Sequence, residues 1–271
     1  MSKPANAPPA FVRRAPWERL RAFTAARIAL GRVGVSVPTA AYLDFQLSHA
    51  RARDAVHLPL DREKLFAGLG ELGLPVLELY SRAGDRREYL LRPDLGRRLA
   101  PESLAALQNA VASESAEQAD LALVIADGLS APAIERQTIP FLRAFLPLAR
   151  RRGWRLAGTV FVNLGRVAVG DEVGEILGAK VAAVLIGERP GLSSPDSMGV
   201  YLTYAPIKGL TDERRNCISN IRPEGQPFEQ AARTLEHLLA KSLAAKISGV
   251  DLKDDQALPD PTLPPSRTVT A

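Results

Sequence analysis

The chain has 271 residues, enough to bury one large hydrophobic core or two smaller ones. It is 46% hydrophobic and 24% charged, no apolar run is long enough to cross a bilayer, and the N-terminus lacks the apolar stretch of a secretory signal. The single cysteine, Cys217, excludes an internal disulfide, predicts a reducing compartment and, with three scattered histidines, argues against a structural zinc site.

The net charge of +5 is unevenly placed along the chain. Residues 1–40 contain seven basic residues and one acidic residue, which gives them a charge of +6 and leaves the rest of the chain at −1. A basic arm on a nearly neutral body is typical of a segment that docks on an acidic surface, either a nucleic acid or a protein partner. A solvated helix face without a partner explains the same charges equally well.

The first part of the chain is predicted to be mainly helical over residues 16–115. A Pro- and Ala-rich arm (1–15) is predicted to be disordered. A helix is predicted from Trp17 to Leu30 because its apolar residues fall roughly on one helical face. Thr39 is suited to cap a second helix over 39–57, and a third helix is predicted over 61–72. A strand at 74–80 and short helices at 94–98 and 103–112 follow.

Residues 68–73 read GLGELG, which matches the G-x-G-x-x-G pattern of dinucleotide-binding loops. That loop must follow a buried strand, whereas this one follows DREKLFA, a charged segment with a helical pattern. We therefore interpret these glycines as the end of a helix.

Strands alternate with helices over residues 116–254. Strands are predicted at 121–126, 156–163, 181–187 and 200–205, and helices at about 131–150, 171–178 and 228–247. Pro140 and Pro147 are expected to break or kink the first of these helices. The alternation predicts an α/β domain with a Rossmann-like, mostly parallel sheet flanked by helices. The polar, Pro-rich tail (255–271) is predicted to be disordered.

Three of the predicted strands end in residues suited to a ligand site. The apolar run LALVIA leads to Asp127, VAAVLIG leads to Glu188, and the strand at 156–163 leads through a glycine turn into a helix. The carboxyl ends of parallel strands form the ligand-binding crevice of open α/β sheets. Glu188 can pair with Arg189 or accept hydrogen bonds from a ligand, and Asp127 has the same ambiguity.

Other motifs give weaker signals. Ser193 or Ser194 with Asp127 would suit a stand-alone α/β hydrolase, but no G-x-S-x-G elbow is present and no histidine lies near the strand ends. A Walker-type phosphate loop is absent. Cys217, taken alone, is best interpreted as a small buried hydrophobe.

Many segments resemble the small (light) subunit of adenosylcobalamin-dependent ethanolamine ammonia-lyase. They are TAARIALGRVG (24–34), LDFQLSHARARDAVH (43–57), SRAGDRREYLLRPDLGRRL (81–99), DLALVIADGLSA (120–131), RVAVGDEVGEIL (166–177), LIGERPGLSSPDSMGVYLTYAP (185–206), RRNCISNIRP (214–223) and SGVDLKD (248–254). The combination of LIGERPGLSSPDS with NCISNIRP is the most specific part, and the resemblance runs from about residue 16 to residue 254.

The resemblance implies an α/β domain that binds adenosylcobalamin at the junction with a barrel-type large subunit, in a hetero-oligomer with several copies of each. The corrin contacts that it implies are Val167, Glu188 and Cys217, with Asp127, Arg166 and Arg189 in equivalent places as further pocket residues. No protein residue is implied as a metal ligand. The D-x-H-x-x-G motif is absent, so the cofactor is expected to keep its own benzimidazole as the lower ligand.

The implied reaction is the radical deamination of ethanolamine to acetaldehyde and ammonia. Catalytic residues are implied in the large subunit and none in this chain, which is then inactive alone. The implied setting is the bacterial cytoplasm, free or within an ethanolamine-utilisation microcompartment, with no nucleic-acid or membrane partner. Two rival hypotheses stay open: the hydrolase described above, and a nucleic-acid-binding module that uses residues 11–32.

Overall fold

The computed structural model describes residues 11–112 and 118–255. The disorder predicted for residues 1–10 and 256–271 lies outside the described residues. Within the described ranges, none of the helices combines the length and the apolar character that a membrane span requires.

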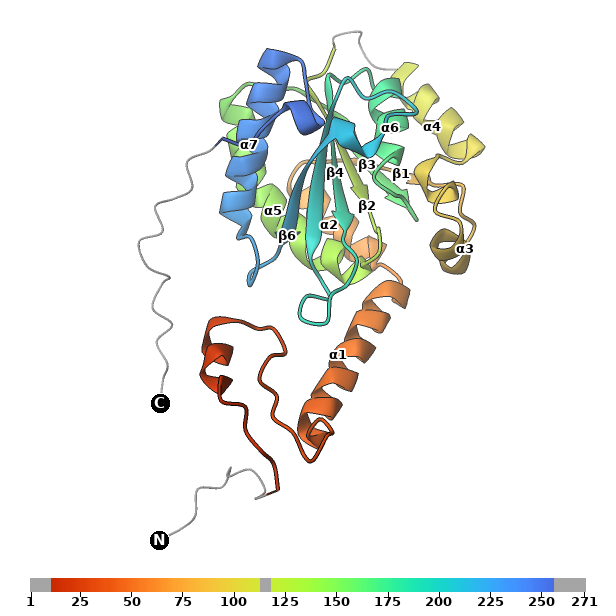
Figure 1. The fold of residues 1–271 in the computed structure, drawn as a ribbon. Coiled ribbons are helices and arrows are strands. Elements are labelled where there is room, and N and C mark those ends of the chain that lie inside the picture. The colour runs from red at the N-terminus through yellow and green to blue at the C-terminus, as the bar shows by residue number, and fades with distance from the viewer. Residues whose placement is uncertain (1–10, 113–117, 256–271) are drawn as a thin grey trace.

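A mixed sheet of six strands forms the centre of the described structure (Figure 1). The strands are β1 (Val76–Tyr80), β2 (Leu121–Ala126), β3 (Leu156–Asn163), β4 (Val181–Gly187), β5 (Met198–Tyr204) and β6 (Arg215–Ile221). Their order is β1-β3-β2-β4-β5-β6. Strands β1 to β4 are parallel, whereas β5 and β6 are antiparallel to their neighbours. The predicted α/β class with a mostly parallel sheet is confirmed.

Helices cover both faces of the parallel strands. The helices α2 (Arg62–Glu71), α5 (Ala131–Arg151) and α7 (Phe228–Ala245) pack on one face, and α4 (Pro101–Ala112) and α6 (Val169–Ile176) on the other. Every residue of β2 and β4 is buried for this reason. The chain leaves β2 through α5 and β3 through α6, so the two loops lead to opposite faces of the sheet.

The two prolines do not break the helix predicted at residues 131–150, because α5 runs from Ala131 to Arg151 with both of them inside it. Its buried face includes Phe141, Leu142 and Phe145, which pack on the sheet. Tertiary packing of an apolar face supplies most of the stability of a helix in a protein, so it can offset the backbone hydrogen bonds that a proline removes.

The helix predicted from Trp17 to Leu30 was also wrong. Only a short 3-10 helix, η1 (Glu18–Phe23), forms there, and none of its residues is buried. Its apolar side chains are therefore not covered by the described residues, and Phe23 is 85% exposed. Residue Arg13 pairs with Arg32 in an antiparallel bridge, which closes this segment into a loop.

Helix α1 (Thr39–His57) projects away from the sheet (Figure 1). It begins at the expected residue, but Pro38 occupies the N-cap position that we predicted for Thr39. Buried residues on α1 are Ser48 and Ala55. Helix α2 ends at Glu71 and is followed by Gly73 with a φ of +75°, which confirms the helix-ending role of the glycine motif.

Short elements complete the structure. They are α3 (Arg86–Leu91), η2 (Leu95–Arg97), η3 (Asp212–Arg214) and η4 (Gly249–Asp251). Side chains of Asp61, Asp85 and Ser130 accept backbone N–H groups at the starts of α2, α3 and α5. Such caps satisfy the free donors of a helix start and fix where each helix begins.

Candidate functional site

A hollow of about 420 Å³ lies at the carboxyl ends of the parallel strands. Its lining residues come from α3, from the loops after β2 and β3, from the end of β4 and the loop after it, and from β5: Tyr89, Leu129, Arg166, Val167, Ile186, Gly187, Glu188, Arg189 and Tyr201. Because the loops after β2 and β3 lead to opposite faces, this edge is the crevice where open α/β sheets bind ligands.

Four of the six site residues predicted from the sequence line this hollow: Arg166, Val167, Glu188 and Arg189. Val167 belongs to the turn that follows β3, and Glu188 directly follows β4. Strands β3 and β4 lie on either side of β2. The strand ends that the sequence analysis expected to converge therefore do converge.

Asp127, the fifth predicted residue, lies behind the hollow. It is only 6% exposed, and its Oδ2 atom is 3.5 Å from Nη1 of Arg86. Burial raises the pKa of this carboxyl to about 6, against the opposing influence of Arg86 and of the backbone N–H groups of Leu164 and Gly165. The carboxylate thus faces the turn after β3 and helps to support it.

Cys217, the sixth predicted residue, lies on β6 directly opposite Tyr201 on β5. The prediction of a buried hydrophobe was wrong, since Cys217 is exposed on an edge strand. Desolvation by the atoms packed around the sulfur nevertheless raises the pKa of the thiol. Cys217 is therefore a protonated thiol at neutral pH, beside a tyrosine that lines the hollow, and a poor metal ligand.

Glu188 joins the end of β4 to the end of β6. Its two carboxylate oxygens accept the backbone N–H of Asn220 at 3.2 and 3.1 Å. Among the described residues Asn220 is the hydrogen-bond partner of this carboxylate, whereas Arg189, the partner considered from the sequence, is exposed. A carboxylate offers about four acceptor positions, so Glu188 keeps acceptor capacity on the side of the hollow.

The loops after β2 and β4 meet backbone to backbone. The N–H of Leu129 donates to the carbonyl of Gly187 at 2.9 Å. Gly128 has a φ of +61°, and a Cβ atom at this position would lie 2.3 Å from the same carbonyl oxygen. Only glycine fits both constraints. This contact places Leu129 beside Glu188 in the lining.

Two guanidinium groups contact the ring of Tyr89, which lines the hollow. The Cζ atom of Arg86 lies 4.8 Å from the ring centroid, and that of Arg166 lies 4.5 Å from it. The hydroxyl of Tyr89 donates to the carbonyl of Gly165 at 3.3 Å. Burial is the main cause that raises the pKa of Tyr89 to about 12, so the phenol stays protonated.

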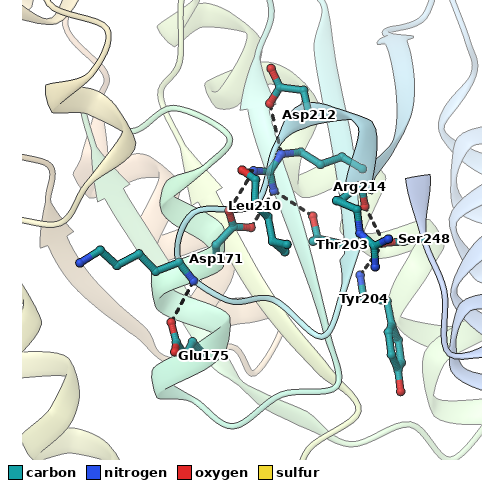
Figure 2. Close-up of polar contacts among 10 residues, drawn as sticks. Asp171, Glu175, Thr203, Tyr204, Leu210, Asp212, Arg214 and Ser248 are labelled. Carbon is teal, nitrogen blue, oxygen red and sulfur yellow. Dashed lines mark hydrogen bonds and ion pairs between the residues drawn. The ribbon is translucent and has the colours of Figure 1, made fainter. Parts of the chain in front are cut away.

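A buried ion pair fixes α6 against β6, and Figure 2 shows the contacts around it. The guanidinium of Arg215 donates to both oxygens of Asp171, at 2.6 and 2.8 Å, and both side chains are 2% exposed. Arg215 also donates to the carbonyl of Leu210 at 3.0 Å. Asp171 lies in the first turn of α6, just past Val167, and Arg215 begins the strand that carries Cys217. The pair therefore ties the helix that follows Val167 to the strand that carries Cys217.

The geometry gives no support to the hydrolase hypothesis. Ser194 is part of a tight turn in which its N–H donates to the carbonyl of Gly191 at 3.2 Å. His237 lies on α7, where its Nε2 atom is 2.9 Å from the carboxylate of Asp255. Across residues 11–112 and 118–255, no three His, Cys, Asp or Glu side chains form a group that could hold a metal ion.

Sequence reasoning missed Tyr89, Leu129 and Tyr201 in the lining of the hollow. Tyr89 belongs to a six-residue helix, which is too short to show a periodic pattern. Tyr201 lay in a predicted strand, and a hairpin connection to the strand ending before Glu188 would have placed it next to the site.

Comparison with known proteins gives a consistent result. The family model described as "Ethanolamine ammonia-lyase light chain (EutC)" matches residues 14–253. Three similar proteins are each named "Ethanolamine ammonia-lyase small subunit". One from Azotobacter vinelandii is 54% identical over 240 residues, which cover 89% of this chain and 88% of that protein. One from Pseudomonas putida is 56% identical over 241 residues (89% and 88%), and one from Pseudomonas fluorescens is 54% identical over 240 residues (89% and 86%).

Proposed function

The chain belongs to the ethanolamine ammonia-lyase light chain family, and from this membership we propose that it binds adenosylcobalamin jointly with a large subunit. The two-subunit enzyme would deaminate ethanolamine to acetaldehyde and ammonia. The observation that carries the proposal is the hollow at the strand ends, which Val167 and Glu188 both line.

The chemistry of the hollow fits the rim of a corrin ring. That rim carries amides, which donate through N–H and accept through C=O. Glu188 supplies an acceptor, Arg166 and Arg189 supply donors, and Val167 and Ile186 supply apolar contact. The Nε atom of Arg166 is buried and has no hydrogen-bond partner among the described residues, so it needs an acceptor from outside them.

The size of the hollow supports a shared site. A cavity of about 420 Å³ is in the range that encloses a drug-sized ligand, and a corrinoid is larger. This chain can therefore hold one edge of the macrocycle, and a second surface must cover the rest. A large subunit, which the name "small subunit" of the relatives implies, would supply it in a hetero-oligomer.

Adenosylcobalamin, when bound, supplies the radical that takes hydrogen from ethanolamine. The residues of this chain bind and orient. Glu188 accepts an amide N–H in a shielded place, where charge-assisted hydrogen bonds are strong. Val167 offers methyl groups to the ring, and Cys217 offers a neutral thiol. The groups that act on the substrate then belong to the large subunit, in the bacterial cytoplasm or in an ethanolamine-utilisation microcompartment.

Co-expression with a candidate large subunit tests the proposal. Ammonia release from ethanolamine should require both chains and added adenosylcobalamin. Ammonia release by this chain alone would contradict the proposal. Turnover by the two chains without the cofactor would also overturn it.

A further inference from the structure

Arg86 lies behind the hollow, and its guanidinium contacts two separate parts of the chain, the end of α1 and the turn after β2. Its Nε atom donates to the carbonyl of Val56, in the last turn of α1, at 2.5 Å. Its Nη1 atom donates to the carbonyl of Gly128 at 2.6 Å and lies 3.5 Å from Oδ2 of Asp127. Arg86 is not one of the lining residues, so it does not need to touch a ligand to affect the hollow.

One line of contacts leads from Arg86 to Glu188. The hydrogen bond to the Gly128 carbonyl fixes the turn after β2. That turn packs directly on the backbone of Gly187. The N–H of Leu129 donates to the Gly187 carbonyl, and Gly128 lies so close to the same carbonyl that a side chain would not fit between them. Glu188 is the next residue. The position of Glu188 thus depends on the turn that Arg86 holds.

A second line of contacts leads from Arg86 to Val167. The Cζ atom of the Arg86 guanidinium lies over the ring of Tyr89, and the Cζ atom of Arg166 lies over the same ring. Arg166 also donates from Nη2 to the backbone carbonyl of Tyr89 at 2.9 Å. Val167 is the next residue. One side chain therefore contacts the supports of both Val167 and Glu188.

We propose that Arg86 is a positioning residue that sets the separation of Val167 and Glu188 across the hollow. The proposal rests on the proposed function, since it concerns the same site. It uses properties of the arginine guanidinium, namely a planar group with N–H donors in several directions and a delocalised cation that lies over an aromatic ring. Lysine keeps a positive charge near Asp127 but lacks the planar guanidinium group and its several directed N–H donors.

The test uses Arg86→Lys in the complex co-expressed with the large subunit, with Arg87→Lys as the matched control on the exposed side of α3. Equilibrium dialysis measures the affinity for cyanocobalamin, and visible circular dichroism reports the surroundings of the bound corrin. We expect Arg86→Lys to weaken binding about tenfold, the low end of the loss when a supporting partner of a bound group is removed. The dichroism should change, and the KM for adenosylcobalamin should rise more than kcat falls. The control should match the wild type.

The outcomes separate this inference from the proposed function. If the wild-type complex does not bind cyanocobalamin, the proposed function fails. If the wild type binds and Arg86→Lys equals Arg87→Lys in affinity and dichroism, the inference alone is overturned. If the Arg86→Lys chain no longer assembles with its partner, Arg86 is an assembly residue and the inference is also overturned.

Discussion

Glu188 is a charged side chain at the end of a strand that is buried along its whole length. Among the described residues, its carboxylate accepts hydrogen bonds from the Asn220 N–H, so the backbone contact holds the carboxylate in place while part of it still faces the hollow. A fixed carboxylate has already lost its conformational freedom before a ligand arrives, which favours binding.

Replacing Glu188 with glutamine should weaken cobalamin binding by the assembled complex by about 1–3 kcal/mol, the scale of a hydrogen bond to a charged group. The amide keeps the shape but loses the negative charge that an amide N–H prefers. Equilibrium dialysis with cyanocobalamin measures the difference. Glu63→Gln, on the exposed side of α2, is the matched control. Unchanged affinity would remove Glu188 from the site.

Asp127 gives the structure a pH-dependent stability. Burial raises its pKa from the ordinary 3.8 to about 6 in the folded chain. Below pH 4 the carboxyl is protonated in both states. Between about pH 4 and pH 6 the unfolded chain releases this proton first, so the folded state binds more protons and its stability falls as pH rises. A shift of about two units corresponds to about 3 kcal/mol.

Asp127→Asn removes this titration. From pH 4 to pH 7 the free energy of unfolding should fall by up to about 3 kcal/mol more in the wild type than in the variant. Urea unfolding at pH values across this interval measures both. A difference between the two proteins that stays constant with pH would contradict the interpretation of Asp127 as a buried, raised-pKa carboxyl.

At the scale of elements, the sequence predicts the ranges of buried strands better than those of strands at the exposed edge of the sheet. The residue ranges of β2, β3 and β4 match the predictions because each contains a continuous apolar run. Strand β6 was missed because its sequence, RNCISNI, alternates imperfectly at the edge of the sheet. The contacts of Arg86 could not be predicted, since they join residues more than 25 positions apart through backbone carbonyls, which leave no pattern in the sequence.

The Asp171–Arg215 pair joins two elements that are distant in the sequence, and it is almost fully buried. Asp171→Asn should lower the free energy of unfolding by about 3–5 kcal/mol, because it leaves the Arg215 charge buried with a neutral partner. The matched change Asp212→Asn should cost less than about 1 kcal/mol, since Asp212 is 83% exposed where it meets the same arginine. Urea unfolding compares them. An equal loss in the free energy of unfolding for the two variants would show that burial does not decide the strength of the ion pair.

For the whole molecule, the segment before α1 contributes little to the core. Phe11, Trp17 and Phe23 are 67%, 56% and 85% exposed, and the same stretch is strongly basic. Exposed aromatic side chains among arginines are typical of an interface more than of a free surface. We therefore expect this segment to serve assembly.

Deleting residues 1–32 should reduce co-purification with the large subunit while the unfolding temperature of the chain changes by less than about 4 °C, the shift that about 1 kcal/mol causes at this size. Pull-down of the co-expressed partner and a thermal melt measure the two effects. Normal co-purification of the truncated chain would refute the docking role.

The nucleic-acid hypothesis for the same segment makes a different prediction. A basic arm that binds DNA or RNA should show an affinity that falls steeply with salt, because binding releases counterions from the phosphates. Filter binding at low salt tests this directly. We expect no retention of nucleic acid by the full chain. Retention that falls with salt and is lost when residues 1–32 are deleted would favour the nucleic-acid hypothesis.

The change of strand direction after β4 has a consequence for access. Two parallel neighbours require a crossover, which lays a helix over the sheet, whereas the antiparallel β5 returns through the short connection at 188–197. An antiparallel pair tolerates water on one side. The reversal therefore spares the Tyr201 and Cys217 side of β5 and β6 a crossover helix, so within the described residues this side is where we expect the large subunit to dock.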